Sequence, residues 1–344
     1  MAQNTRPLVG ISVGDPGGIG PEITAKSLAV PEVYEICRPL AVADARFMRD
    51  AVAFSKLDLK VHPIASPEEG LYTFGTIDVL DMANMPPEQL QYKTVSAAQG
   101  KASYEYIAKN IALAMAGVID ATVTGPINKA AINAADYHFA GHTEIYAHLT
   151  NTKNYTMMLA DGDFRVTHVS THVSLREACD RVKKDRVLAV IKLTADTVAK
   201  MGLASPRIAV AGLNPHCGEG GLFGTEDDLE ISPAVADACT LGLNVQGPLP
   251  ADTVFSKMLG GQFDAVVCMY HDQGHIPTKL NGFTFNETTN QWDAVAGVNI
   301  TLGLPIIRVS VDHGTAFGKA GEGRANPESM LDSIRLAAKL AQHA

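Results

Sequence analysis

The sequence predicts an α/β fold of mostly parallel sheets with helices on both faces, divided into two domains with a cleft between them. Short apolar runs alternate with segments of helical periodicity along the 344 residues, and this alternation is typical of βαβ units. The chain is also longer than one hydrophobic core usually organises, which favours two domains. Alternation therefore predicts the fold class, and length predicts the number of domains.

Each predicted strand is a β-rich run that ends at turn-forming residues, and the predicted helices lie between such runs. Strands are expected at residues 8–13, 39–44, 77–82, 121–126, 207–213, 264–270 and 306–312. Helices are expected at residues 21–30, 45–56, 96–118, 182–202, 228–241 and 327–343. Pro21 and the pair Asn326-Pro327 are typical of the first turn of a helix, so two of these helices carry their own start signals.

One segment interrupts this rhythm. The run YTMMLADGDFRVTHVST contains two strand-like stretches on either side of Asp161-Gly162-Asp163. A short connection that contains glycine predicts a β-hairpin. We expect an antiparallel pair of strands here, and a dimerisation arm is one role for it.

Composition and charge disfavour several classes of partner. Hydrophobic residues make up 46% and charged residues 19% of the chain, as in a compact globular protein. Binding to nucleic acid or to an anionic membrane needs clustered Lys and Arg, and a net charge of −9 disfavours both partners. The N-terminus lacks a signal-peptide pattern, and no uninterrupted apolar stretch of about 18 residues occurs. We therefore expect a cytoplasmic protein whose five scattered cysteines, without a CxxC pair, are reduced.

Three histidines follow predicted strands. His172, His216 and His271 come after the runs FRVTHVST, RIAVAGLNP and DAVVCMY. Ligands of open α/β sheets bind beyond the carboxyl ends of strands. Neutral imidazoles that converge there, with carboxylates such as Asp272 nearby, suit a divalent metal that keeps open positions for substrate. Any one of them alone is more typical of a hydrogen-bonded loop residue, and it is the coincidence of three that favours a metal site. Other histidines compete for the role: His168, His275 and His313.

Two glycine-rich segments are candidates for binding a nucleotide. GDPGGIGPE follows the first strand and allows a tight turn with close approach of a ligand to the backbone, although a simple connection between strand and helix explains it equally well. It lacks the GxGxxG spacing, so the Rossmann fingerprint is absent. DHGTAFGKAGEGRANP leaves the last predicted strand and leads into the C-terminal helix. The candidate contacts in the two segments are Gly14, Asp15, Gly18, Gly314, Thr315, Ala316 and Asn326.

Together these segments resemble the 4-hydroxythreonine-4-phosphate dehydrogenase (PdxA) family. The matching motifs span nearly the whole chain in one order: GDPGGIGPE, VTGPINK, GHTE, STHVSLR, GLNPHCGEGG, GPLPADT, YHDQG, GVNITLGLPIIR and SVDHGTA. The family is similar in fold to isocitrate and isopropylmalate dehydrogenases, which have no Rossmann domain and bind NAD or NADP through a loop resembling DHGTAFGKAGEGRANP. The resemblance implies NAD as the cofactor. NADP stays open, because Gly318 replaces the acidic residue that isopropylmalate relatives use against the ribose.

The resemblance also implies a site that two subunits of a homodimer share. The metal ligands match His172, His216 and His271, the last of them from the partner subunit, and zinc, manganese, cobalt and magnesium all suit this set. We assign nucleotide binding to residues 1–125 plus 303–344, and metal binding, substrate binding and dimerisation to residues 126–302. Substrate contacts match His142, Thr143, Lys279, Asn299 and Arg308. The catalytic candidates are Lys279, Asp252 and Asp272.

The implied reaction is oxidation and decarboxylation of a small 4-phosphorylated 3-hydroxy acid. A divalent ion would gather the hydroxyl and the carboxylate while hydride passes to the nicotinamide. Residues 280–297 form a longer link than is usual after the motif lysine, and His275 stands where an apolar residue is more usual. Both features favour the branch that acts on D-threonate or D-erythronate 4-phosphate, whose products would be dihydroxyacetone phosphate, CO2 and NADH.

Other functions stay open from the sequence. A 4-hydroxythreonine-4-phosphate dehydrogenase would serve pyridoxal 5'-phosphate (vitamin B6) biosynthesis. A dehydrogenase for cyclic diol carboxylates would need no phosphate site, so Arg308 and Lys279 disfavour it. A metal-dependent hydrolase or aldolase would use the histidines without NAD. A non-catalytic sensor is disfavoured because Asn299 and the other site residues are all retained.

Overall fold

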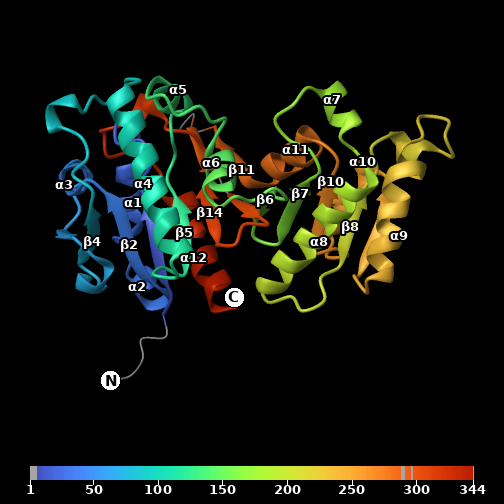
Figure 1. Cartoon of the computed structure of the whole chain (residues 1–344), viewed down its shortest axis with the longest axis horizontal. Coiled ribbons are helices and arrows are strands. Elements are labelled where there is room, and N and C mark those ends of the chain that lie inside the picture. The colour runs from blue at the N-terminus through green and yellow to red at the C-terminus, as the bar shows by residue number, and fades with distance from the viewer. Residues whose placement is uncertain (1–5, 288–290, 296, 344) are drawn as a thin grey trace. The chain divides into compact units, whose positions relative to one another are not determined.

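The computed structural model describes residues 6–287, 291–295 and 297–343, which form two compact units (Figure 1). Unit 1 runs to Thr152 and resumes at Leu304, and unit 2 comprises Lys153–Gly303. Residues 126–152, which the sequence analysis assigned to the second domain, lie in unit 1. The reason is packing, because Ile132, Ile145 and Tyr146 share a core cluster with Ile107 and Ile111 of the N-terminal part of the chain.

Unit 1 is a parallel sheet covered by helices. Its strand order is β3-β4-β2-β1-β5-β14, and every neighbouring pair is parallel. The strands are β1 (Leu8–Ser12), β2 (Arg38–Ala43), β3 (Lys60–Ile64), β4 (Thr76–Asp81), β5 (Ala121–Thr124) and β14 (Arg308–Val311). The helices are α1 (Gly20–Ser27), α2 (Pro31–Ile36), α3 (Ala45–Phe54), α4 (Ala97–Met115), α5 (Lys129–Ala134), α6 (His142–Leu149) and α12 (Glu328–Gln342). Strands β1 and β5 are buried along their whole length, as expected for parallel strands covered on both faces.

Unit 2 is a mixed sheet with the strand order β13-β6-β7-β10-β8-β9. Its strands are β6 (Thr156–Asp161), β7 (Phe164–His168), β8 (Ile208–Ala211), β9 (Val245–Leu249), β10 (Ala265–Cys268) and β13 (Val298–Leu302). Its helices are α7 (Leu175–Asp180), α8 (Lys184–Lys200), α9 (Ser232–Thr240), α10 (Ala251–Leu259) and α11 (His271–Gly282). Strands β6 and β7 form the predicted hairpin, with Gly162 at φ 56° in its turn. Both strands lie within the sheet of unit 2, paired to β13 and β10, and do not form a separate arm.

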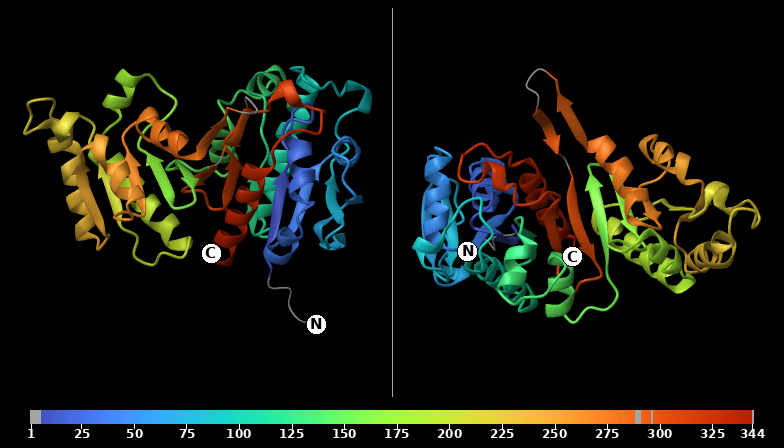
Figure 2. Two further views of the ribbon diagram at one scale, coloured as in Figure 1. Left: turned by 180° about the vertical axis from the view of Figure 1, so that it is seen from behind. Right: turned by 90° about the horizontal axis from the view of Figure 1, so that it is seen from above.

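The segment that lengthens the link after Lys279 forms a hairpin of its own. Strands β11 (Phe283–Asn286) and β12 (Gln291–Val295) pair antiparallel in a separate two-stranded sheet directly after α11. This hairpin is the orange pair of strands at the top of the right-hand view in Figure 2. Among the described residues, no helix is both long enough and apolar enough to cross a lipid bilayer.

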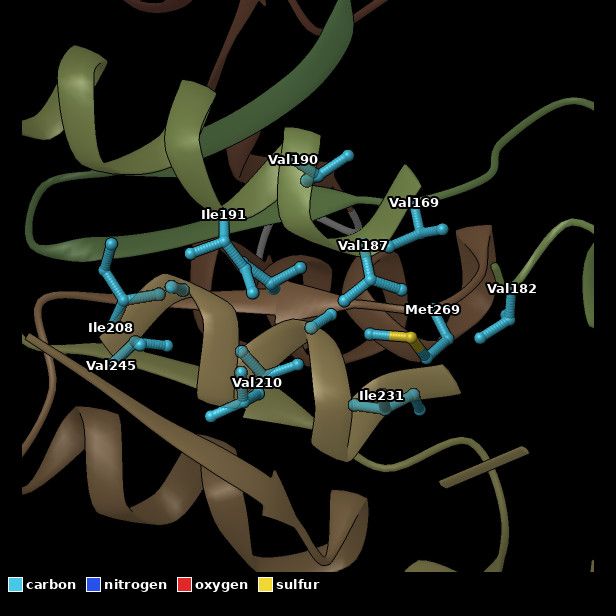
Figure 3. Close-up of a cluster of buried hydrophobic side chains, with 14 of the residues drawn as sticks. Val169, Val182, Val187, Val190, Ile191, Ile208, Val210, Ile231, Val245 and Met269 are labelled. Carbon is cyan, nitrogen blue, oxygen red and sulfur yellow. The ribbon is translucent and has the colours of Figure 1, made fainter. Parts of the chain in front are cut away.

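The two faces of the unit 2 sheet bury alternate residues of the same strands. Ile208 and Val210 of β8 contact a cluster that contains Ile191 of α8 (Figure 3). Ala209 and Ala211 of the same strand belong to a second cluster, formed with α10. Because successive strand residues point to opposite faces, a strand with helices on both sides is apolar throughout. This explains why the run 207–213 has no polar alternation.

Truncation of Ile191 to alanine should destabilise unit 2. The side chain is fully buried, and its loss removes apolar contacts and leaves a cavity, which costs about 2–5 kcal/mol. Chemical denaturation followed by circular dichroism measures the change. The control is Leu241→Ala, whose side chain is 58% exposed and should change stability by less than about 0.5 kcal/mol. Equal effects of the two substitutions would show that this core is not as described.

Candidate functional site

The three histidines follow three neighbouring strands of unit 2. Strand β10 lies between β7 and β8 and is parallel to both, so all three strands end at one edge of the sheet. His172 lies in the loop after β7, His216 lies in the loop after β8, and His271 begins α11 after β10. Each histidine therefore follows a strand as predicted, and the structure adds that the three strands are neighbours in one sheet.

A pocket of about 510 Å³ opens at two of these strand ends. His172 and His271 both line it, together with Ser174, Tyr270 and Asp272. The two imidazole ring centroids are 5.8 Å apart. Two imidazoles and one carboxylate thus line the pocket, and these are side-chain types that bind divalent ions in proteins.

The His271 ring is held in one orientation. Its Nδ1 lies 2.6 Å from Oδ1 of Asp272, which favours the tautomer with the proton on Nδ1. The Nε2 atom is then the one suited to a metal, as in carboxylate–histidine–metal arrangements. Asp272, a predicted catalytic residue, therefore contacts a predicted ligand directly.

His216 lies in a loop with an unusual backbone. Every residue of 216–221 has a positive φ, including His216 at 53° and Cys217 at 56°. The buried carboxylate of Asp227 holds the start of this loop by accepting from the backbone N–H groups of Leu213 and Asn214, at 2.9 and 3.0 Å. Non-glycine residues with such φ values often occur at functional sites, where the surrounding structure supports them.

The described residues of one chain do not assemble a complete set of metal ligands. No group of three or more His, Cys, Asp or Glu side chains could hold a metal ion in the part of the chain that the structure describes. His172 and His271 share the pocket, whereas His216 is not among the residues that line it. The three-histidine metal site accordingly stays a prediction.

Gln273 is a residue of the site region that the sequence analysis missed. Its buried amide accepts from the Met269 N–H at 2.7 Å and donates to the Gly212 carbonyl at 2.8 Å. It therefore ties the loop that leads to His271 to the loop that leads to His216. Its place in the motif YHDQG was visible, but no sequence pattern showed where its amide would bind.

The other predicted residues of unit 2 lie on three elements. Lys279 is in the last turn of α11, and Asp252 is exposed in the first turn of α10. Asn299 is half-buried in β13, and its amide nitrogen lies 2.6 Å from the Met157 sulfur. Among these, Lys279 follows the site histidine His271 on the same helix, so one helix carries both a predicted ligand and a predicted catalytic residue.

Unit 1 contains three predicted substrate residues, Arg308, His142 and Thr143, of which Arg308 is a buried cation. Arg308 of β14 is 2% exposed, donates to the Thr124 hydroxyl at 3.0 Å, and lies 5.5 Å from the Tyr146 ring. Burial lowers the pKa of its guanidinium to about 10. His142 and Thr143 begin α6, where helix N–H groups favour an anion. Burial, with smaller contributions from Arg308 and Lys129, lowers the pKa of His142 well below its usual range, so its imidazole is neutral at pH 7.

The two glycine-rich segments contact each other in unit 1. The Ile19 N–H donates to the Thr315 carbonyl at 3.1 Å, and a Cβ on Gly18 would lie 3.0 Å from the Thr315 Cβ. The carboxylate of Glu22 accepts from the Ala325 N–H at 2.5 Å. These contacts bring Gly18 and Thr315 together, and the role of the two residues in nucleotide binding stays a prediction.

Gly14 and Asp15 are buried, and their contacts within unit 1 define the turn after β1. Gly14 has φ 83°, and a Cβ there would lie 2.2 Å from the Pro126 carbonyl oxygen. Asp15 is fully buried and accepts from the Gly17 N–H at 2.9 Å. The side chain of Asn326 accepts from the Glu328 N–H at 2.9 Å, which caps α12. These three residues thus shape the segments, and Gly314 and Ala316 lie in the loop before α12.

Residues 35–337 match the family model described as "Pyridoxal phosphate biosynthetic protein PdxA". The chain belongs to the PdxA family. A relative from Symbiobacterium thermophilum with the name "Putative D-threonate 4-phosphate dehydrogenase" is 47% identical over 338 residues, which cover 98% of each chain.

Solved structures of PdxA-family proteins share the fold. A 4-hydroxythreonine-4-phosphate dehydrogenase from Burkholderia phymatum matches with a TM-score of 0.84 and 43% identity, covering 97% of this chain and 98% of that one. A terephthalate 1,2-cis-dihydrodiol dehydrogenase from Burkholderia xenovorans matches with a TM-score of 0.69 and 30% identity, covering 97% and 98%. The predicted family and the α/β fold class are confirmed, and the dehydrogenase names support an oxidoreductase.

Asp15 gives unit 1 a specific pH dependence. Burial raises the pKa of its carboxyl from 3.8 to about 6. The folded protein therefore binds more protons than the unfolded chain between these values, so stability falls as pH rises through this window. At pH 7 the buried charge of Asp15 lowers the free energy of unfolding by up to about 3 kcal/mol.

Asp15→Asn should therefore raise the melting temperature at pH 7, because it removes the charge and keeps an oxygen for the Gly17 N–H. The difference from the parent protein should shrink as the pH is lowered to 4. Thermal unfolding between pH 4 and 8 measures it, with the exposed Asp58→Asn as the control. A variant that is destabilised at every pH would contradict this account of Asp15.

Proposed function

We propose that the chain is a metal-dependent, NAD-linked dehydrogenase that oxidises and decarboxylates a 4-phosphorylated 3-hydroxy acid. The proposed substrates are D-threonate and D-erythronate 4-phosphate. Oxidation at C3 passes hydride to NAD, and loss of the C1 carboxylate as CO2 leaves dihydroxyacetone phosphate. The observation that supports this most directly is that His172, His216 and His271 all follow adjacent parallel strands at one edge of the unit 2 sheet.

The residues present fit a divalent ion, which we propose His172, His216 and His271 hold. Two imidazoles and a carboxylate line the pocket, and Asp272 fixes the tautomer of His271. When bound, a divalent ion supplies Lewis acidity toward hydroxyl and carboxylate oxygens. The family resemblance assigns His271 of each site to the partner subunit, so each chain would give His172 and His216 to one site and its own His271 to the other. A cytoplasmic homodimer with shared sites is therefore part of the proposal. Zinc, manganese, cobalt and magnesium all suit these ligands.

The chain's own polar residues have the chemistry to bind and orient such a substrate. Arg308 is a buried planar cation that suits a phosphate group through paired hydrogen bonds. His142 is neutral, so it offers a hydrogen bond to phosphate without a full charge. Thr143 adds a hydroxyl at the start of α6. In unit 2, Asn299 is assigned to the substrate, and Lys279 is assigned to proton transfer or to holding an anion.

Unit 1 is the proposed site for the nicotinamide cofactor. The two glycine-rich segments pack together there, and they supply backbone N–H groups and a capped helix start for the diphosphate. Lys26 fixes this arrangement by donating to the Gly323 and Ala325 carbonyls at 2.9 and 2.7 Å. NAD is the proposed cofactor. NADP is the alternative, because Gly318 has no carboxylate that would repel the additional phosphate on the ribose of NADP.

The second candidate is 4-hydroxythreonine-4-phosphate dehydrogenase activity in pyridoxal 5'-phosphate biosynthesis. It is supported by the name of the solved structure at 43% identity. Action on a cyclic diol carboxylate is supported only by the relative at 30% identity and leaves the buried Arg308 without a phosphate to bind. Hydrolase or aldolase chemistry without NAD would leave the paired glycine-rich segments of unit 1 without a role.

The substrate assignment predicts a ranking of activities. D-threonate 4-phosphate with NAD and a divalent ion should give NADH, with a kcat/KM at least about tenfold above that for 4-phosphohydroxy-L-threonine. Unphosphorylated D-threonate should be a poor substrate, because Arg308 would lose its anion. Absorbance at 340 nm measures the formation of NADH with each of the three substrates. A reversed ranking would favour the pyridoxal phosphate role, and the absence of NADH with every substrate would reject a dehydrogenase.

The metal assignment predicts that His216→Ala lowers turnover by more than about a hundredfold, because it removes a ligand. The circular dichroism spectrum should be unchanged, since the side chain is not part of a core cluster. His138→Ala, a substitution at an exposed histidine of unit 1, is the control and should keep full activity. Full activity of His216→Ala, or of the parent protein after chelation, would refute the metal site.

A further inference from the structure

We infer that His275 is a positioning residue for the metal ligand His271, whose imidazole it holds from one face. The inference rests on the proposed function, because it takes His271 to be a ligand. It goes beyond that proposal in giving a role to a histidine that no ligand assignment uses. It also gives a reason for a histidine where the family resemblance leads us to expect an apolar residue.

Two direct contacts join the residues. The rings of His275 and His271 are stacked, with centroids 3.6 Å apart and planes inclined by only 11°. The Nδ1–H of His275 donates to the backbone carbonyl of His271 at 2.9 Å. One side chain therefore contacts both the ring and the backbone of the same residue, which restricts rotation of the His271 ring out of its plane.

Asp272 supplies the complementary restraint. Its carboxylate lies 2.6 Å from Nδ1 of His271 and so opposes rotation of the ring within its own plane. With stacking on a face and a hydrogen bond at an edge, the ring has one supported orientation, in which Nε2 carries the lone pair. A ligand fixed in this way loses less conformational freedom when it binds a metal.

His275 is itself held by a rigid neighbour. It is 8% exposed, and its ring centroid lies 4.7 Å from that of His168, which is fully buried in β7. His168 donates from Nδ1 to the Met157 carbonyl at 3.4 Å. Burial lowers the pKa of His168 to about 3, so it is a neutral packing group. His275 therefore packs between the His271 ring and His168 of strand β7.

Gly274 makes this arrangement possible. A Cβ on residue 274 would lie 2.5 Å from Nε2 of His168, so only glycine lets α11 approach the ring this closely. Within the segment YHDQGH, Asp272 contacts the edge of the His271 ring and His275 stacks on its face. Gly274 leaves the space that the His168 ring occupies. An apolar residue at position 275 would fill the space but would not donate to the His271 carbonyl.

Three substitutions separate the two contacts. His275→Phe keeps a flat ring for stacking and loses the donor, whereas His275→Asn keeps an amide donor near the position of Nδ1 and loses the ring. His275→Leu loses both. Co²⁺ is the probe, because its visible absorption reports both the extent of binding and the ligand geometry. Metal-free parent protein and each variant are titrated with Co²⁺, with His138→Phe as the matched control in unit 1.

We expect His275→Leu to weaken Co²⁺ binding by about 10- to 100-fold, as is usual when a partner of a metal-ligating histidine is lost. The His275→Phe and His275→Asn variants should each bind Co²⁺ more tightly than His275→Leu does. All three variants should alter the absorption spectrum of bound Co²⁺. The control should match the parent protein. If His275→Leu does not fold, the Phe and Asn variants decide the question alone.

A His271→Ala titration separates this inference from the proposed function. If His271→Ala binds Co²⁺ weakly while all His275 variants bind as the parent protein does, the positioning role of His275 is refuted and the ligand assignment stands. If His271→Ala binds Co²⁺ with parental affinity and spectrum, His271 is not a ligand and both proposals fail.

Discussion

Parallel strands must all end at one edge of their sheet, and the proposed chemistry of this protein depends on that constraint. In unit 2 it applies to β7, β10 and β8, which are neighbours in space although long segments of chain separate them. Their loops therefore emerge together, and each carries one of the three histidines. Helices α8 and α9 cover one face of this sheet and α10 covers the other, and they bury alternate residues of these strands. Packing on both faces therefore holds the strand ends in place.

The two units have different electrostatic characters. Unit 2 presents two imidazoles and one carboxylate in an open pocket, a combination suited to a hard or borderline cation. Unit 1 buries the Arg308 guanidinium and keeps the neighbouring His142 neutral, which suits an anion. Because the net charge is −9, the phosphorylated acid of the proposed function would depend on this local positive charge for binding.

Much of the fold could be predicted from the sequence because its signals are local. The long apolar and amphipathic segments that form β1, β5, β8, α4 and α8 all lie where periodicity placed them. Strands β3 and β9 were missed because both are edge strands that contain a proline, which weakens the strand pattern. Helices α5, α6 and α7 were missed because they are short and their apolar spacing covers only one or two turns.

The site was predictable only in part. The order of strands decides which loops meet, and no residue pattern near His172 or His216 records that order. The contacts of Gln273 and His275 are likewise tertiary, since each joins segments that are brought together by the sheet. Gly14 is a further example, because the close approach of the Pro126 carbonyl to this glycine is a tertiary contact that the glycine-rich pattern did not reveal.

The central claim is that imidazoles from the strand ends of unit 2 hold one divalent ion. X-ray absorption spectroscopy of the purified protein loaded with one equivalent of Zn²⁺ tests this most directly, because imidazole ligands produce characteristic multiple scattering. The account predicts a first shell of nitrogen and oxygen atoms at about 2.0–2.2 Å, with scattering from three imidazoles. A first shell made only of oxygen, or one that contains sulfur, would contradict it.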